Sequence, residues 1–299
     1  MNILFRVDSS SKIGLGHLTR CLVLAEEYER DNIILFAVQE LKGNANQKII
    51  KQGYKLVVLN DNSTSELLKN IDKFDIDMVV FDHYHINDKF EKIIKETASI
   101  TILSLDDTYE KHHCDILLNH NIYANADSYK GLVPDFCEVK CGSEHTLIGK
   151  NFRDVKIKER LNDREVPAIF VSFGGSDANN IGLAVLKLLS EFSNILVTLA
   201  TTSSNQNIRK LQKFTNQYNN MSICIDCNIA ELMNSSDLAI ITPSVIVYEA
   251  MYLKLPFLAV QTANNQRYVS EYLASSGFLL GDIRNMHKTK RLIQELLRR

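Results

Sequence analysis

The sequence of 299 residues has almost no excess of charge of either sign. It contains 34 lysine and arginine residues and 36 aspartate and glutamate residues, which gives a net charge of −2. Proteins that bind nucleic acid usually carry a basic stripe or patch, and no long basic stripe is present here. We therefore expect no nucleic-acid partner.

Long apolar runs are also missing. The longest apolar region, residues 238–253, contains Pro243 and Glu249 and cannot form a membrane-spanning helix. The apolar stretch at residues 1–7 is interrupted by Arg6 and is too short for the apolar core of a signal peptide. We expect a cytoplasmic protein without membrane insertion. Neither an internal repeat of 20–50 residues nor a low-complexity segment is visible.

Six cysteines are present without a secretory signal that would favour disulfide bonds, so we expect buried thiols. Cys224 and Cys227 have the CxxC spacing of a zinc ligand pair. A zinc site needs a second ligand pair, and the neighbouring residues offer none. Zinc is therefore the lesser alternative for this pair.

A chain of this length is too long for one hydrophobic core and suits two domains. Short runs rich in Ile, Leu, Val and Phe alternate with longer helical patterns, which is typical of buried parallel strands joined by crossover helices. In the first half these runs are residues 3–7, 33–38, 55–59, 78–82 and 100–105. In the second half they are residues 168–173, 195–200, 221–225, 238–241 and 257–260, with helices from Asn180, Asn207, Asn228, Val245 and Gln266.

The alternation is broken once, by the charged residues 151–165, which show no apolar periodicity and precede Pro167. We place the domain boundary there, with domains at residues 1–150 and 151–299. The last residues, 286–299, carry an apolar helical stripe and should pack against the second domain. The predicted fold is α/β, with two doubly wound Rossmann-like domains facing each other across a cleft.

A glycine-rich turn follows the first predicted strand. It contains Gly14 and Gly16 and ends at His17, where a helix begins. Thr19 stands where the dinucleotide fingerprint has its third glycine, so the turn is not that motif. His17 should lie at the carboxyl edge of the sheet, where open α/β folds bind ligands. A functional histidine is favoured, and a capping or core histidine is the alternative.

The second domain opens with a similar turn containing Gly174, Gly175 and Ser176. Its backbone N–H groups could hold a diphosphate without lysine or metal. A tight turn with no ligand is the alternative.

Polar residues follow two further strands of the second domain. Ser244 precedes a helix that carries Glu249, whose carboxylate could accept both hydroxyls of a ribose. A solvated or capping glutamate is the alternative. Asn264, Asn265 and Gln266 offer amides that suit sugar hydroxyls and acetamido groups, although amides are equally common in turns and helix caps.

Two segments of the first domain, Asp82-His83-Tyr84-His85 and Asp106-Asp107, also follow strands and should lie near His17. Such a His/Asp cluster could ligate a metal or form a hydrogen-bonded sugar pocket. The sugar pocket is favoured.

The sequence resembles the UDP-2,4-diacetamido-2,4,6-trideoxy-β-L-altropyranose hydrolases, often called the PseG family, within the MurG-like glycosyltransferase-B superfamily. The likeness spans nearly the whole chain and is most specific at His112-His113-Cys114-Asp115-Ile116-Leu117-Leu118-Asn119 and Tyr129-x-Gly131-Leu132-Val133-Pro134. Other matching segments are Phe5-Arg6-x-Asp8-Ser9-Ser10-Ser11, Ile13-Gly14-x-Gly16-His17, Asp82-His83-Tyr84, Cys141-Gly142, Gly174-Gly175, Leu211-Gln212-Lys213-Phe214, Glu249-Ala250 and Asn265-Gln266.

This resemblance implies a metal-independent hydrolysis of the UDP-sugar in pseudaminic acid biosynthesis, a route to flagellin glycosylation, without a cofactor. It implies that His17 is the general base and that water breaks the anomeric C–O bond with inversion. It implies that Tyr84 and Asn265 lie near the sugar and that the Gly174–Ser176 turn and Glu249 hold UDP. Together with the positions described above, the predicted sugar-binding residues are Gly16, Tyr84, Asn264, Asn265 and Gln266. The predicted UDP-binding residues are Gly174, Gly175, Ser176, Ser244 and Glu249.

The chemistry needs few groups, because UDP leaves as a stabilised anion and requires no general acid of the kind used by glycosidases. One base and N–H dipoles for the departing charge are sufficient. The alternatives are a MurG-like transferase, which needs an acceptor site, and a nucleotide-sugar binding protein without turnover. We expect a monomer.

Overall fold

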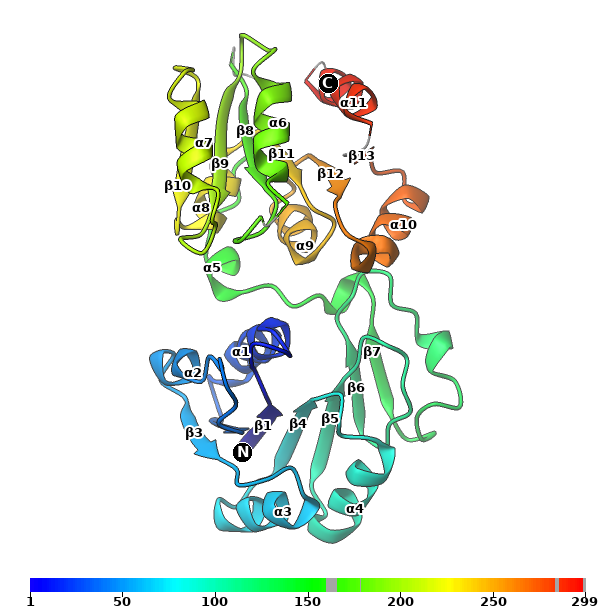
Figure 1. The fold of residues 1–299 in the computed structure, drawn as a ribbon. Coiled ribbons are helices and arrows are strands. Elements are labelled where there is room, and N and C mark those ends of the chain that lie inside the picture. The colour runs from blue at the N-terminus through cyan, green and yellow to red at the C-terminus, as the bar shows by residue number, and fades with distance from the viewer. Residues whose placement is uncertain (160–165, 178, 283–284, 298–299) are drawn as a thin grey trace. The chain divides into compact units, whose positions relative to one another are not determined.

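The computed structural model describes residues 1–159, 166–177, 179–282 and 285–297, and the side chains of Asn265 and Met286 lie outside this description. The chain divides into two compact units, Met1–Gly149 and Lys150–Arg299, each built around its own parallel sheet (Figure 1).

Unit 1 contains seven parallel strands in the order β3-β2-β1-β4-β5-β6-β7. The strands are β1 (Asn2–Val7), β2 (Ile33–Val38), β3 (Lys55–Val58), β4 (Met78–Asp82), β5 (Thr101–Leu105), β6 (Ile116–Asn119) and β7 (Glu138–Cys141). The chain changes direction across the sheet between β1 and β4. Such a switch point opens a crevice at the carboxyl ends of the strands.

Helices cover both faces of this sheet. They are α1 (Gly16–Tyr28), α2 (Gln47–Lys51), α3 (Thr64–Lys73) and α4 (Asp88–Ala98), with the 3₁₀ turns η1 (Ala126–Tyr129) and η2 (Ser143–His145). Because successive strand residues point to opposite faces, Phe5 joins the core beneath α1 whereas Leu4 joins the core beneath α3 and α4. The strands are therefore buried on both faces, and their sequences are nearly continuous apolar runs.

Unit 2 contains six parallel strands in the order β10-β9-β8-β11-β12-β13. The strands are β8 (Ala168–Ser172), β9 (Leu196–Thr201), β10 (Met221–Ile225), β11 (Leu238–Ile241), β12 (Phe257–Gln261) and β13 (Leu280–Asp282). The helices are α5 (Lys150–Arg153), α6 (Ile181–Leu189), α7 (Ile208–Thr215), α8 (Ile229–Ser235), α9 (Val245–Tyr252), α10 (Arg267–Ser275) and α11 (Met286–Leu296), with the 3₁₀ turn η3 (Asn264–Gln266). The switch point lies between β8 and β11.

The predicted α/β class with two doubly wound parallel sheets is confirmed. All ten predicted strands are present, and each end lies within one residue of its prediction. Three strands were missed, β6, β7 and β13, because they have only three or four residues and give no long apolar run. The short helix α5 was also missed in the charged stretch, where Phe152 is its one buried residue.

The predicted packing of the C-terminal stripe is confirmed for its described part. Ile293 is fully buried, and Leu292, Leu296 and Leu297 pack against the same core of unit 2. Within the described part of the chain, no helix is both long enough and apolar enough to cross a membrane.

Candidate active site

His17 lies in the first turn of α1 and is only 8% exposed. Its Nδ1 is 2.6 Å from Oδ1 of Asp82, the last residue of β4. Asp82 pairs with Val7, the last residue of β1, so the contact lies at the switch point of the sheet. The doubly wound topology therefore brings together two residues that are 65 positions apart.

Arg20 lies three residues after His17, on the same side of α1. Its Nε donates to Oδ2 of Asp82 over 2.6 Å, and a terminal nitrogen donates to Oδ2 of Asp107 over 2.7 Å. Burial raises the pKa of Asp82, but the charge and hydrogen bonds of Arg20 and the hydrogen bond to His17 outweigh it and hold that pKa well below its ordinary value. Asp82 is therefore a carboxylate at neutral pH.

The ionised state of Asp82 determines which nitrogen of His17 carries the proton. Arg20 also approaches Nδ1, to 2.9 Å, but a guanidinium can only donate, and Nδ1 cannot both accept from it and donate to the carboxylate. Since a carboxylate can only accept, Nδ1–H donates to Asp82. In the neutral ring, Nε2 then carries the lone pair, as a general base requires.

Tyr84 covers the imidazole of His17. The two ring centroids are 4.5 Å apart and the rings are nearly perpendicular, at 86°. The Tyr84 hydroxyl donates to Oδ1 of Asp107 over 3.2 Å. Burial and the charge of Asp107 raise the pKa of Tyr84 to about 12, so its hydroxyl keeps its proton at neutral pH.

His120 directly follows β6 and is 5% exposed. Burial and the nearby charge of Arg20 lower its pKa to about 4, against the opposing effect of Asp82 and Asp107. His120 is therefore a neutral imidazole next to the charged groups of the site. The sequence-based prediction missed it because it also missed strand β6.

A second ionic group fixes the loops around this site. Arg6 donates to both oxygens of Asp8 over 2.8 Å, and both side chains are almost completely buried. Nε2 of His83 lies 3.0 Å from Asp8, and Nδ1 of His83 accepts the backbone N–H of His85. These bonds tie the loop after β4 to the loop after β1.

The glycine-rich loop before α1 is folded onto itself. The Ser10 hydroxyl accepts the N–H groups of Lys12 and Ile13, and the Ser10 carbonyl accepts that of Gly14 over 2.8 Å. Gly14 has a φ of +84°, where glycine is favoured. The amides of Lys12, Ile13 and Gly14 are therefore engaged within the protein and do not form a phosphate cradle.

Unit 2 contains a pocket of about 290 Å³ at the carboxyl ends of β8, β9 and β10. Its lining residues are Asn151, Phe152, Ser172, Gly174, Gly175, Ala200, Thr201, Thr202, Asp226, Cys227, Ile229, Ile246 and Glu249. Gly174, Gly175 and Glu249 are among the predicted UDP-binding residues, whereas Ser176 and Ser244 are not part of this lining.

The Gly174–Gly175 turn is held by the end of β9. Hydroxyls of Thr201 and Thr202 donate to the carbonyl of Gly175 over 2.9 and 3.0 Å. A Cβ at Gly175 would lie 2.8 Å from the Thr202 side chain, so packing alone already requires a glycine there. The carboxylate of Asp177 accepts the first two N–H groups of α6, so the protein's own anion occupies that helix terminus.

The start of α9 differs from that of α6. Its N-cap residue Ser244 makes no side-chain capping bond. In the nearby strand end, the buried Oγ1 of Thr242 has no hydrogen-bond partner within the described ranges. The first two turns of α9 place Ile246 and Glu249 on the pocket wall. A helix N-terminus with free amides is a binding site for an anion.

Glu249 is largely buried in this pocket, and burial raises the pKa of its carboxyl to about 7. No hydrogen bond or ion pair from a described side chain compensates this burial. An acceptor in this state is suited to hydroxyl groups of a ligand.

The chain is 41% identical over 280 residues to the UDP-2,4-diacetamido-2,4,6-trideoxy-β-L-altropyranose hydrolase of Campylobacter jejuni subsp. jejuni serotype O:2. The alignment covers 93% of this chain and 98% of that protein. The chain belongs to this family of hydrolases. No family model matches it.

The fold of this hydrolase is of the glycosyltransferase-B type. It superimposes on MurG of Acinetobacter baumannii with a TM-score of 0.65 and 13% identity, covering 99% of this chain and 90% of MurG. It superimposes on the UDP-GlcNAc 2-epimerase of Neisseria meningitidis with a TM-score of 0.62 and 14% identity, covering 100% and 92% of the two chains.

The predicted His/Asp cluster of the hydrolase is only partly assembled. Asp82, Tyr84 and Asp107 lie with His17, whereas His83 binds Asp8 and the side chain of Asp106 turns toward Tyr129. No group of three or more potential metal ligands occurs among the residues that the structure describes.

The predicted amide group behaves differently at its three positions. Oε1 of Gln266 accepts the N–H groups of Thr262 and Ala263, so this amide stabilises the turn, as the alternative interpretation proposed. Asn264 is exposed. The side chain of Asn265 lies outside the described part.

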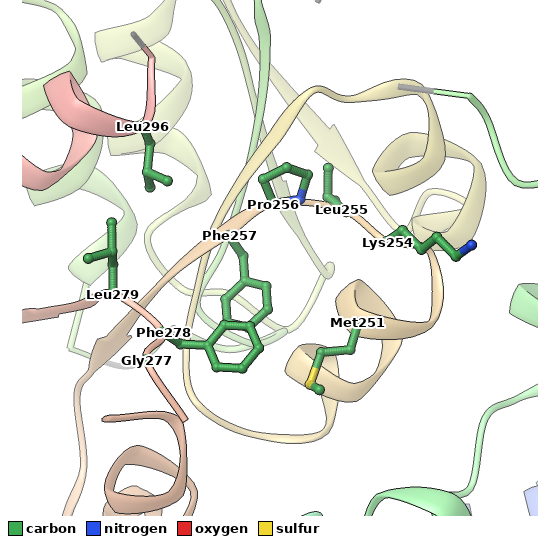
Figure 2. Close-up of a pocket in the computed structure, with 9 residues that line it drawn as sticks. All are labelled: Met251, Lys254, Leu255, Pro256, Phe257, Gly277, Phe278, Leu279 and Leu296. Carbon is green, nitrogen blue, oxygen red and sulfur yellow. The ribbon is translucent and has the colours of Figure 1, made fainter. Parts of the chain in front are cut away.

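A larger cavity of about 390 Å³ in unit 2 lies away from the strand ends that form the site (Figure 2). Its walls are mostly apolar, and the rings of Phe257 and Phe278 are stacked 5.1 Å apart on one side. Phe257 is the first residue of β12, so this cavity is at the amino edge of the sheet, opposite the switch point.

Proposed function

We propose that this protein hydrolyses UDP-2,4-diacetamido-2,4,6-trideoxy-β-L-altropyranose to UDP and 2,4-diacetamido-2,4,6-trideoxy-L-altrose, as a step of pseudaminic acid biosynthesis. The observation that carries the proposal is the buried pair of His17 and Asp82, in a chain that belongs to the hydrolase family. The pair provides a general base at the switch point, where ligands of this fold class bind.

In the proposed reaction, Nε2 of His17 takes a proton from water as the water oxygen attacks the anomeric carbon. The bond between that carbon and the UDP oxygen breaks on the opposite face, so the configuration inverts. The resulting imidazolium is stabilised by the Asp82 carboxylate. A well-placed general base contributes about 10²–10⁴-fold in rate. No step needs a metal or cofactor.

We assign UDP to the pocket of unit 2. The carboxylate of Glu249 suits the ribose hydroxyls, and apolar walls such as Ile229 and Ile246 suit the flat uracil ring. The uncapped start of α9 at Ser244 favours the diphosphate. The amides of Gly175 and Ser176 are additional candidates.

We assign the sugar to the surface around His17, with Tyr84 as the best-supported contact because it touches the base directly. Gly16 leaves open space, since a Cβ there would meet no atom within 4 Å. Asn264 and Asn265 remain predicted sugar contacts, and Gln266 is the weakest because its amide oxygen is engaged. The monomeric state and cytoplasmic location also remain predictions.

The test is incubation of the protein with the UDP-sugar in EDTA, with UDP and free sugar followed by NMR. In H₂¹⁸O, attack at the anomeric carbon puts the label in the sugar, whereas attack at phosphorus puts it in UDP. His17→Asn should lower turnover at least about 100-fold while the Kd for UDP stays unchanged. His287→Asn, an exposed histidine of α11, is the matched control and should behave as wild type. An H17N variant with normal turnover would exclude His17 as the base.

A further inference from the structure

A base in a glycosyltransferase-B fold can deprotonate any hydroxyl that reaches it, so an additional feature must make water the acceptor. Nε2 of His17 requires an oxygen within about 2.6–3.2 Å. An alcohol at that position also brings a carbon substituent next to the imidazole. Residues that cover the imidazole therefore decide how large an acceptor can be.

Tyr84 is the outer cover of the base. His17 is 8% exposed, whereas Tyr84, which is in ring contact with it, is 65% exposed. The aromatic ring thus lies between the imidazole and the surroundings. Its edge-to-face contact, with centroids 4.5 Å apart, leaves no space for another group between the two rings.

The cover is held from two directions. The Tyr84 hydroxyl donates to Asp107, and Asp107 accepts from Arg20 over 2.7 Å, the same guanidinium that binds Asp82. The loop itself is held at His83, the residue before Tyr84. The His83 side chain bonds to Asp8, and the His83 carbonyl accepts the N–H of Ile86. The position of the ring is therefore coupled to the ion pairs that orient the base.

We propose that Tyr84 is the residue that restricts the acceptor to water and so makes this site a hydrolase site rather than a transferase site. This inference rests on the proposed function. With water or an alcohol, the acceptor O–H proton moves to Nε2 of His17, the acceptor oxygen bonds to the anomeric carbon, and UDP leaves with the electron pair of the broken C–O bond. The two reactions differ only in the group attached to the acceptor oxygen, and the ring of Tyr84 excludes that group.

The experiment compares the wild type, Tyr84→Ala and Tyr84→Phe in buffer containing methanol or 1-propanol as the probe acceptor. The ratio of alkyl glycoside to free sugar is measured by NMR or mass spectrometry. In Y84A this ratio should rise about tenfold or more above wild type. Tenfold is the lower end of the discrimination that a site gains by excluding one small carbon group. Y84F keeps the ring but loses the hydrogen bond to Asp107, so its ratio should lie between those of wild type and Y84A.

Phe136→Ala is the control, because Phe136 is an aromatic residue of unit 1 with a similar exposure of 60% and lies before β7 rather than at the strand ends. It should give the wild-type ratio. Because Tyr84 is exposed, the melting temperature of Y84A should match that of wild type.

The outcomes separate the two proposals. If the wild type releases no free sugar from the UDP-sugar, the proposed function fails. If the wild type hydrolyses the substrate and Y84A does so with an unchanged product ratio, only the acceptor role of Tyr84 fails. Loss of both reactions in folded Y84A also overturns the acceptor role, because Tyr84 would then be needed whatever the acceptor is.

Discussion

The buried carboxylate of Asp82 binds both His17 and Arg20, and the Cys21 thiol also donates to it. It accepts Nδ1–H of His17 and two nitrogens of Arg20, and its side chain is 1% exposed. Arg20 keeps the carboxylate charged, and the charged carboxylate keeps the proton of the imidazole on Nδ1. The tautomer that leaves Nε2 without a proton in the neutral ring therefore depends on Arg20.

Asp82→Asn tests this dependence. An amide lacks the charge that pairs with Arg20, and its NH₂ group cannot accept Nδ1–H of His17. We therefore expect kcat to fall about 10²–10⁴-fold, in the range lost when a base is misoriented or held in the wrong tautomer. The Kd for UDP should not change. Steady-state kinetics and UDP titration measure the two quantities. A parallel loss of kcat and UDP affinity would contradict the role and indicate general misfolding.

Glu249 allows a prediction about pH. Its pKa is raised to about 7 by burial, so between pH 6 and pH 8 it changes from mostly protonated to mostly ionised. If the ionised form holds the ribose, UDP affinity should increase over this interval by up to about tenfold, the value of charged hydrogen bonds. Calorimetric titration with UDP measures the pH dependence of the Kd in wild type and in Glu249→Gln. The difference between the two proteins is due to Glu249, because ionisation of UDP itself affects both equally. Equal pH profiles would remove Glu249 from the ribose site.

The sequence predicted the acidic and aromatic partners of His17 because they follow strands that meet at one edge of the sheet. Arg20 was not predicted, since its role depends on Asp82 and Asp107, which lie 62 and 87 positions away. The spacing could have predicted that Arg20 lies near the site, because it follows His17 by three residues on one helix face. For Gln266, the sequence could not show whether the amide stabilises a turn or contacts the sugar. The structure shows a turn, because Oε1 accepts two backbone N–H groups.

At the scale of elements, strands with several apolar residues were predictable, including the short edge strand β3, whereas β6, β7 and β13 were not. β4 is buried at all five residues, whereas β7 has no buried residue and β13 has one. β7 and β13 have only one or two apolar residues each, so the sequence shows no apolar run there and the pairing with the neighbouring strand decides their structure. The position of His120 depends on β6, a four-residue strand with three buried residues that was also missed.

Gly16, in the first turn of α1, allows a test that separates helix stability from sugar binding. A Cβ at Gly16 meets no atom within 4 Å, and alanine is favoured over glycine in helices by up to about 1 kcal/mol. Gly16→Ala should therefore keep or raise the melting temperature. If the sugar approaches this turn, the KM for the UDP-sugar should rise several-fold while the Kd for UDP stays constant.

Gly14→Ala is the structural control for that variant. Its φ of +84° is strained for any residue with a side chain, so it should lower the melting temperature. Kinetics and thermal denaturation of both variants are the measurements. An unchanged KM in G16A would place the sugar away from this turn.

At the scale of the whole molecule, the division into two units was predictable because the alternation of strands and helices stops once and starts again. The internal polar network of unit 1 was not predictable. His112 lies with Nδ1 2.8 Å from Glu91, which is completely buried, and with Nε2 3.8 Å from Asp106. Glu91 lies on α4, whereas Asp106 and His112 lie in the loop between β5 and β6, and no local pattern indicates their meeting.

This network connects the most family-specific segments to the site. The Asp106 carboxylate accepts the hydroxyl of Tyr129 and the N–H groups of Thr108 and Tyr109, which fixes the loop that carries Asp107. His112 N–H donates to the carbonyl of Leu132. The segments that carry the resemblance to the family therefore support the loop that places Asp107 beside Arg20 and Tyr84.

The network predicts how the stability of unit 1 depends on pH. Burial lowers the pKa of His112, but the charges of Asp106 and Glu91 and the hydrogen bond to Glu91 outweigh this and raise it to about 10, above the ordinary 6.5. The folded state therefore binds this proton more tightly than the unfolded state. The stabilisation is complete below about pH 6.5 and is lost as the pH rises toward 10.

His112→Gln removes the charge and should lower the free energy of unfolding of unit 1 at pH 7 by about 3 kcal/mol, as expected when a buried ion pair loses one partner. Urea unfolding at pH 7 and pH 9.5 should show a smaller loss of stability with pH in the variant than in wild type. Hydrogen exchange assigns the effect to a unit, because exchange should accelerate in β4 and β5 but not in β8 and β11, whose core is separate. An equal pH dependence in both proteins would show that His112 is not charged in the folded state, and the support of the Asp107 loop would then rest on Tyr129 and the backbone alone.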